Sequence, residues 1–100
     1  MSEERRKNPR IRLNLPARYD GLSGVQESRL EDISFGGCFV NTHAQVTIGE
    51  VISLEIQLPS GEWLRLHGQV TMYQPSIGFG VVFSSLSEDE ERTLRLLIRS

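Results

Sequence analysis

Hydrophobic and polar residues alternate along most of the chain, and this period of two is typical of β-strands that bury one face. The alternation over residues 64–73 places Val70 and Met72 on the same, apolar side. Pro16 has no amide proton, so its strand is expected to lie at a sheet edge or to donate no hydrogen bond there. We predict strands over the clear runs 11–20, 52–58, 64–73 and 79–83, and over the weaker runs 25–33 and 38–40.

The segments between and after these runs indicate how the elements are arranged. Residues 59–61 read Pro-Ser-Gly, a short turn that predicts a hairpin between the two flanking runs. Near the C-terminus the period changes, because Leu94, Leu97 and Ile98 have the spacing of one helix face. Strands in series followed by one helix favour an antiparallel β-barrel, with the helix over an open end or one face of the sheet.

Two serines fit the start of this helix. Ser87 and Glu90 have the spacing of a capping box, and Ser85 and Glu88 have it as well. The sequence does not separate these alternatives. We expect a flexible basic arm, a β-barrel and a C-terminal helix at residues 1–10, 11–85 and 86–100, respectively.

Composition is typical of one folded domain. The 100 residues are 38% hydrophobic and 24% charged, which is sufficient for an apolar core. No apolar run approaches the roughly 20 residues that span a bilayer, and no apolar segment follows the first charged residues. The single cysteine, Cys38, excludes an internal disulfide and suits a reducing compartment. We therefore expect a cytoplasmic protein that does not insert into membranes.

Charge is distributed unevenly within a total of −2. Residues 1–18 carry six basic and two acidic side chains, a net +4, whereas residues 19–100 carry five basic and eleven acidic ones, a net −6. A basic arm on an acidic body indicates a local anion site, since a nucleic-acid-binding domain would be basic over a broad surface. We expect no DNA or RNA partner. A solvated tail is the alternative explanation of the basic cluster.

Two arginines in the arm have a spacing that suits a compact anion. Arg6 and Arg10 are four residues apart, and Pro9 favours extended backbone at the preceding residue. Four extended residues reach about 13 Å, so the two guanidinium groups could hold opposite sides of one ligand. The planar guanidinium fork matches phosphate oxygens and the O6 and N7 acceptors of guanine. Taken alone, however, such a spacing occurs in any basic tail.

A second motif, at residues 32–37, reads Asp-Ile-Ser-Phe-Gly-Gly. Strand spacing places Asp32 and Ser34 on the same side. A carboxylate can accept the N1–H and N2–H donors of guanine, and a serine hydroxyl can donate to a base or phosphate oxygen. The alternative is a simple turn in which both side chains bond nearby backbone. Together, the two motifs describe an anionic, guanine-containing ligand and require no reaction on it.

With these motifs the chain resembles the PilZ domain family. Its signature combines an RxxxR arm with a D/NxSxxG turn, here residues 6–10 and 32–37, and residues 78–83 are similar to its Gly-x-Gly-Val-x-Phe strand. The resemblance covers almost the whole chain. It implies a six-stranded antiparallel β-barrel with a C-terminal helix, and reversible binding of cyclic di-GMP, a bacterial second messenger.

The resemblance also implies a set of ligand contacts. The arginines of the arm bind phosphates and guanine, and the residues of the turn line a guanine site. Arg5 matches a position that in similar proteins influences whether one ligand or a stacked pair binds, and an arginine there favours the pair. No cofactor, metal site or catalytic residue is implied. The expected ligand-binding residues are Arg5, Arg6, Arg10, Asp32, Ser34 and Gly37.

We therefore expect a receptor that changes conformation when cyclic di-GMP binds, as the arm folds across the barrel, and that then signals to a partner protein. One alternative is an adaptor of the same fold that binds a fixed partner independently of nucleotide. Another is a weak nucleic-acid binder, against which the acidic body argues.

An enzyme is not expected, because the sequence has no nucleophile elbow or phosphate loop. His43, His67 and Cys38 lack metal-ligand spacing.

Overall fold

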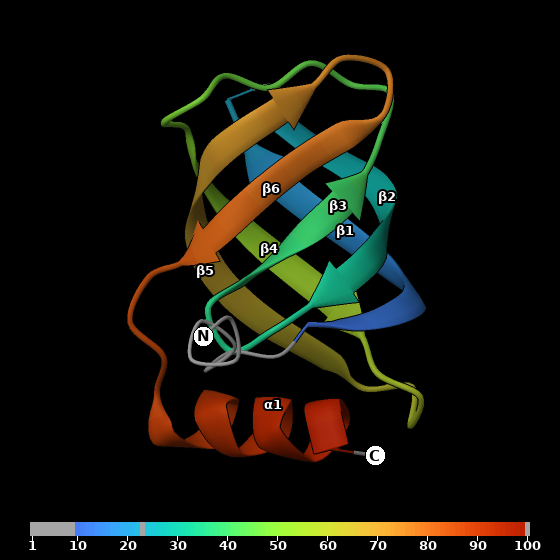
Figure 1. Cartoon of the computed structure of the whole chain (residues 1–100), viewed down its shortest axis with the longest axis vertical. Coiled ribbons are helices and arrows are strands. Elements are labelled where there is room, and N and C mark those ends of the chain that lie inside the picture. Colours follow the sequence, from blue (N-terminus) through green and yellow to red (C-terminus); the bar gives the residue numbers. More distant parts are fainter. Residues whose placement is uncertain (1–9, 23, 100) are drawn as a thin grey trace, which may run out of the picture.

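Six antiparallel strands form a closed barrel in the order β1-β2-β3-β6-β5-β4 (Figure 1). The computed structural model describes residues 10–22 and 24–99. The predicted six-stranded barrel with one helix is confirmed, including the two strands that the alternation indicated only weakly. The elements are β1 (Ile11–Gly21), β2 (Gly24–Ile33), β3 (Gly37–Asn41), β4 (Val51–Gln57), β5 (Trp63–Gln74), β6 (Gly78–Phe83) and α1 (Glu88–Arg99).

The barrel closes where β1 pairs with β4, from Ala17 opposite Ile56 to Asp20 opposite Ser53. Closure provides β1 with a neighbour on both sides, so of the two alternatives predicted for Pro16 the edge position does not apply, and the other does: this residue has no amide proton to donate. Pro16 lies opposite Arg29 of β2, and pairing with β4 begins only at Ala17, one residue later.

The core fills the inside of the barrel with the apolar side of each alternation. Tyr19 of β1 and Phe79 of β6 meet edge to face at its centre, with ring centroids 5.0 Å apart. In β5 the alternation holds from Leu64 to Val70, where every second side chain is buried. These inward rows, contributed by all six strands, form one continuous core.

The helix α1 lies across one end of the barrel (Figure 1). Leu94 and Leu97 are buried, as their spacing predicted. Ser87 is the cap: its hydroxyl accepts the amide proton of Glu90, and the Glu90 carboxylate accepts that of Ser87, at 3.1 and 2.9 Å. In the part of the chain that the structure describes, no helix has both the length and the apolar character needed to cross a bilayer.

The strand register shifts at three points, in β1, β2 and β5, and the β-bulges in β2 and β5 determine where Asp32 and Met72 point. Leu30 and Asp32 of β2 oppose consecutive residues of β3, and Val70 and Met72 of β5 oppose consecutive residues of β6. Each bulge inserts one unpaired residue and reverses the side to which the next side chain points. Leu30 and Val70 are buried, whereas Asp32 is only partly buried and Met72 is 42% exposed. The apolar, inward side expected for Met72 is therefore wrong.

Candidate ligand-binding site

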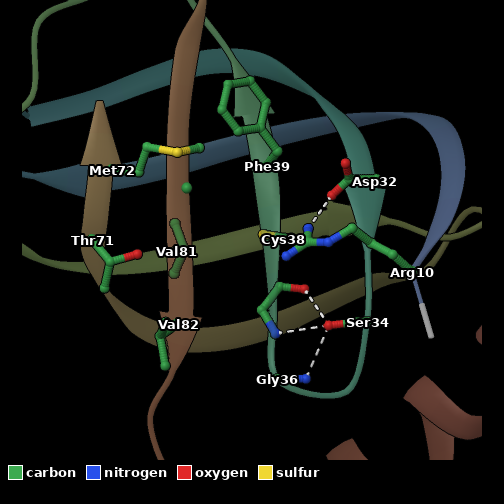
Figure 2. Close-up of a pocket in the computed structure, with 12 residues that line it drawn as sticks. Arg10, Asp32, Ser34, Gly36, Cys38, Phe39, Thr71, Met72, Val81 and Val82 are labelled. Atoms are coloured by element: carbon green, nitrogen blue, oxygen red, sulfur yellow. Dashed lines mark hydrogen bonds and ion pairs between the residues drawn. The ribbon is translucent and has the colours of Figure 1, made fainter. Parts of the chain in front are cut away.

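A cleft of about 660 Å³ lies on the outside of the barrel, beside the β2–β3 turn (Figure 2). Its volume is in the range of small-molecule sites. Strands β2 and β5 contribute to it beside their bulges, together with β3 and β6. The residues that line the cleft are Arg10, Asp32, Ser34, Gly36, Gly37, Cys38, Phe39, Thr71, Met72, Gly80, Val81 and Val82.

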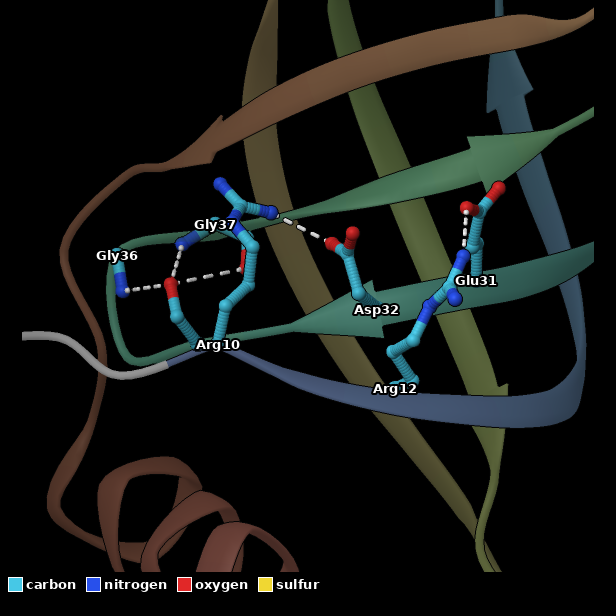
Figure 3. A network of polar contacts seen from close by, with 7 residues as sticks. Arg10, Arg12, Glu31, Asp32, Gly36 and Gly37 are labelled. Atoms are coloured by element: carbon cyan, nitrogen blue, oxygen red, sulfur yellow. Dashed lines mark hydrogen bonds and ion pairs between the residues drawn. The ribbon is translucent and has the colours of Figure 1, made fainter.

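Arg10 and Asp32 bring the two sequence motifs together in this cleft. The Arg10 Nη1 atom lies 2.5 Å from Asp32 Oδ1, and the two side chains are 55% and 19% exposed (Figure 3). Arg10 directly precedes β1, which pairs with β2 through Arg12 opposite Asp32, so the sheet register sets this contact. The bulge in β2 turns the Asp32 carboxylate outward to meet it. A guanidinium fork and a carboxylate thus lie side by side at the cleft surface.

Ser34 lines the cleft, but its hydroxyl holds the turn. It donates to the Gly37 carbonyl oxygen at 3.3 Å and accepts the amide protons of Gly36 and Gly37 at 3.2 and 3.3 Å. The side chain is buried. Ser34 therefore follows the alternative in which the motif is a simple turn, because its side chain bonds nearby backbone. Asp32 does not, because its carboxylate pairs with Arg10 from outside the motif.

Gly37 is required by the close packing of β3 against β6. A Cβ atom at this position would lie 2.1 Å from the backbone carbonyl oxygen of Val81. Its amide is bonded to Ser34 within the turn. Gly37 therefore shapes the cleft floor by allowing two backbones to approach, which is a common use of glycine in strands.

Arg5 and Arg6 lie outside the described residues, as does the rest of the expected arm before Arg10. Of the expected ligand-binding residues, the structure thus places Arg10, Asp32, Ser34 and Gly37 around one cleft. The predicted contacts of Arg5 and Arg6 stay predictions.

The wall formed by β5 and β6 was not anticipated from the sequence. Thr71, Met72 and Val82 line the side of the cleft away from Arg10 and Asp32 (Figure 2). The sequence held one signal of the bulge in β5. Met72 and Tyr73 are adjacent apolar residues, whereas strict alternation would follow an apolar residue with a polar one, and such a break is compatible with a bulge.

Cys38 lies beneath the cleft and is 1% exposed. Burial raises the pKa of its thiol, and the nearby Asp32 carboxylate raises it further, against a smaller opposite effect of Arg10. The protonated, covered thiol is a poor nucleophile. Groups of histidine, cysteine and acidic residues that could hold a metal do not occur among residues 10–22 and 24–99.

We expect a thiol reagent such as iodoacetamide to modify Cys38 at least about 100-fold more slowly in the native protein than in guanidinium chloride, because unfolding exposes the sulfur and restores an ordinary pKa. Mass spectrometry at pH 8 over time measures both rates. Similar rates in the two states would contradict the buried placement of Cys38.

Comparisons with known sequences match nearly the whole chain. The profile of the PilZ domain matches residues 4–100. The alginate biosynthesis protein Alg44 of Pseudomonas putida is 31% identical over 104 aligned residues, which cover 99% of this chain and 27% of that protein. The chain therefore spans about a quarter of the length of this curated relative.

Solved structures share the fold at low sequence identity. The inhibitor of motility MotI/DgrA from Bacillus subtilis superposes with a TM-score of 0.78 at 20% identity, covering 95% of this chain and 50% of that one. The PilZ domain of YcgR from Escherichia coli, whose structure was solved with cyclic di-GMP, has a TM-score of 0.78 at 17% identity, covering 95% and 90% of the two chains. Since the profile covers nearly the whole chain and the barrel is shared, this protein belongs to the PilZ domain family, a family of non-catalytic cyclic di-GMP receptors.

Proposed function

We propose that this protein is itself a receptor for cyclic di-GMP, which changes conformation when the nucleotide binds and then signals to a partner protein. The observation that carries the proposal is the meeting of Arg10 and Asp32, one from each signature motif, at the surface of one cleft. Family membership supports the same conclusion, as does the nucleotide in the structure of the related YcgR domain.

The two side chains offer complementary chemistry to a guanine nucleotide. The Arg10 guanidinium can donate two parallel hydrogen bonds to a phosphate or to the O6 and N7 atoms of guanine. The Asp32 carboxylate can accept from the N1–H and N2–H groups on another edge of the base. Ser34 and Gly37 act indirectly in this proposal, because they fix the turn that positions Asp32.

The ion pair of the free protein is a small obstacle to binding. An exposed pair is worth only about 0–1 kcal/mol, and Arg10 is more than half exposed. A ligand with phosphates and guanine edges offers each partner a replacement bond. We propose that Arg6 supplies a second phosphate contact and that Arg5 favours binding of a stacked pair of nucleotides. The arm closes over the bound nucleotide and presents a new surface to the partner.

Isothermal titration calorimetry with cyclic di-GMP tests the receptor function directly. We expect saturable binding by the wild-type protein, a loss of at least about tenfold in affinity for Arg6→Ala, and no comparable binding of GTP. A stoichiometry of two nucleotides per chain would support the stacked pair, and one would contradict it. Absence of binding by correctly folded protein would instead favour the nucleotide-independent adaptor.

A further inference from the structure

We propose that Met72, Gly80 and Val82 form an apolar wall against which a purine face of the ligand packs, opposite the polar wall of Arg10 and Asp32. This inference rests on the proposed function, because the purine is the base of the bound nucleotide. The three residues belong to neighbouring strands, with Met72 directly opposite Gly80 in the pairing of β5 and β6. They lie outside the RxxxR and D/NxSxxG motifs, although Gly80 and Val82 belong to the Gly-x-Gly-Val-x-Phe strand at residues 78–83.

The outward position of Met72 results from the bulge in β5. If the strand were regular at Thr71, the alternation would place Met72 on the inward side, like Val70. Instead the Met72 side chain lies on the cleft side, 42% exposed, and Val82 beside it is 52% exposed. Bulges frequently re-aim side chains next to functional sites. A single exposed apolar residue has no special meaning, but both of these line the same cleft as the ion pair (Figure 2).

Gly80 differs from Gly68 and Gly78, the other glycines of β5 and β6. A Cβ atom at Gly68 or Gly78 would lie within 2.6 Å of a backbone carbonyl oxygen, so packing requires glycine there. At Gly80 the nearest atoms are those of Met72, at 3.6 and 3.7 Å, which is ordinary van der Waals contact. Close packing of the fold therefore does not require glycine at position 80. Its missing side chain leaves a depression beside Met72, and a strand glycine can mark the close approach of a ligand.

The two walls of the cleft match the two kinds of surface on a purine. The edge of a guanine base carries hydrogen-bond donors and acceptors, which suit the Arg10–Asp32 wall. Its flat face packs favourably against apolar and polarizable groups. Methionine is flexible and makes favourable sulfur–aromatic contacts, so Met72 can adjust over the depression at Gly80. Val82 extends this surface along β6.

Cyclic di-GMP titrations of four variants test this wall. Met72→Ala removes the thioether, Gly80→Leu fills the depression, and Val82→Glu introduces a like charge where the nucleotide would pack. We expect each to weaken binding about tenfold or more, a loss of the size expected when one apolar side chain is no longer buried; the cause is lost contact for Met72→Ala, a steric block for Gly80→Leu and charge repulsion for Val82→Glu. The matched control is Val51→Glu, because Val51 is another outward strand valine, 68% exposed, that does not line the cleft. Its affinity should stay within about twofold of wild type.

The outcomes separate this inference from the receptor function. Wild-type binding with unchanged affinity in Met72→Ala and Gly80→Leu would overturn the apolar wall and leave the receptor intact. Equal weakening by Val51→Glu and Val82→Glu would also overturn it, since general charge repulsion would then explain the loss. No binding by the wild-type protein would overturn both proposals. Thermal unfolding checks that each variant is folded, and Gly80→Ala replaces Gly80→Leu if the larger side chain prevents folding.

Discussion

Alanine in place of Gly37 is expected to lower the free energy of unfolding by about 3 kcal/mol, a large part of the stability of a domain this size. The added Cβ would lie 2.1 Å from the Val81 carbonyl oxygen, and both residues lie in the paired backbones of β3 and β6. No side-chain rotation relieves this contact, so β3 and β6 must move apart. Urea unfolding followed by circular dichroism measures the loss.

Gly80→Ala is the matched control for this experiment. It places the same methyl group on the neighbouring strand, where its nearest contact is 3.6 Å away. We expect its free energy of unfolding to stay within about 1 kcal/mol of wild type, because alanine at an unstrained site restricts the unfolded chain and offsets small packing changes. Equal destabilisation by both variants would show that the close approach at Gly37 is not the cause.

Replacing Arg10 by alanine is expected to weaken cyclic di-GMP binding by at least about 30-fold while changing stability by less than about 1 kcal/mol. Removing one partner of a charge-assisted contact in an interface costs about 2–5 kcal/mol, whereas an exposed ion pair adds little to folding. Calorimetric titration and urea unfolding of the same preparations separate these two effects.

Arg65→Ala is the appropriate control, because Arg65 is also an exposed arginine that pairs with one carboxylate, that of Glu55, at 2.9 Å. It lies outside the cleft. We expect its affinity for cyclic di-GMP to equal that of wild type. If both variants lose affinity to the same extent, the protein attracts anions in general, and binding should then fall steeply with added salt.

The barrel was predictable because most of its strands follow a simple period of two. The run from Leu64 to Val70 and the turn at residues 59–61 define a hairpin from the sequence alone. The cap of α1 was narrowed to two alternatives, and the contacts of Ser87 and Glu90 identify the one that forms. Closure of the barrel was harder to predict from the sequence. Pro16 was compatible with an edge position for β1, whereas this strand pairs with β4.

The cleft was predictable only on its polar side. Asp32 and Arg10 belong to recognisable motifs, and sheet register brings them together. The regular alternation predicted an inward side chain for Met72, because a pattern read from the sequence does not reveal the residue that a bulge adds to one strand. A bulge moves every following side chain to the opposite face, so the apolar side of the cleft depends on strand pairing between distant segments, which local patterns do not specify.

The cleft is assembled from both ends of the chain, since Arg10 precedes the first strand and Val82 lies in the last. During synthesis, β5 is complete before β6, yet β6 must insert between β3 and β5 to finish the site. A nascent chain therefore has no complete cleft until its final strand has docked. By mass action, a ligand that binds only the closed barrel stabilises it relative to chains in which β6 has not docked. The stabilisation is about 2.7 kcal/mol at a free ligand concentration 100 times Kd. Under the proposed function, the messenger would thus both signal through the protein and protect it from unfolding.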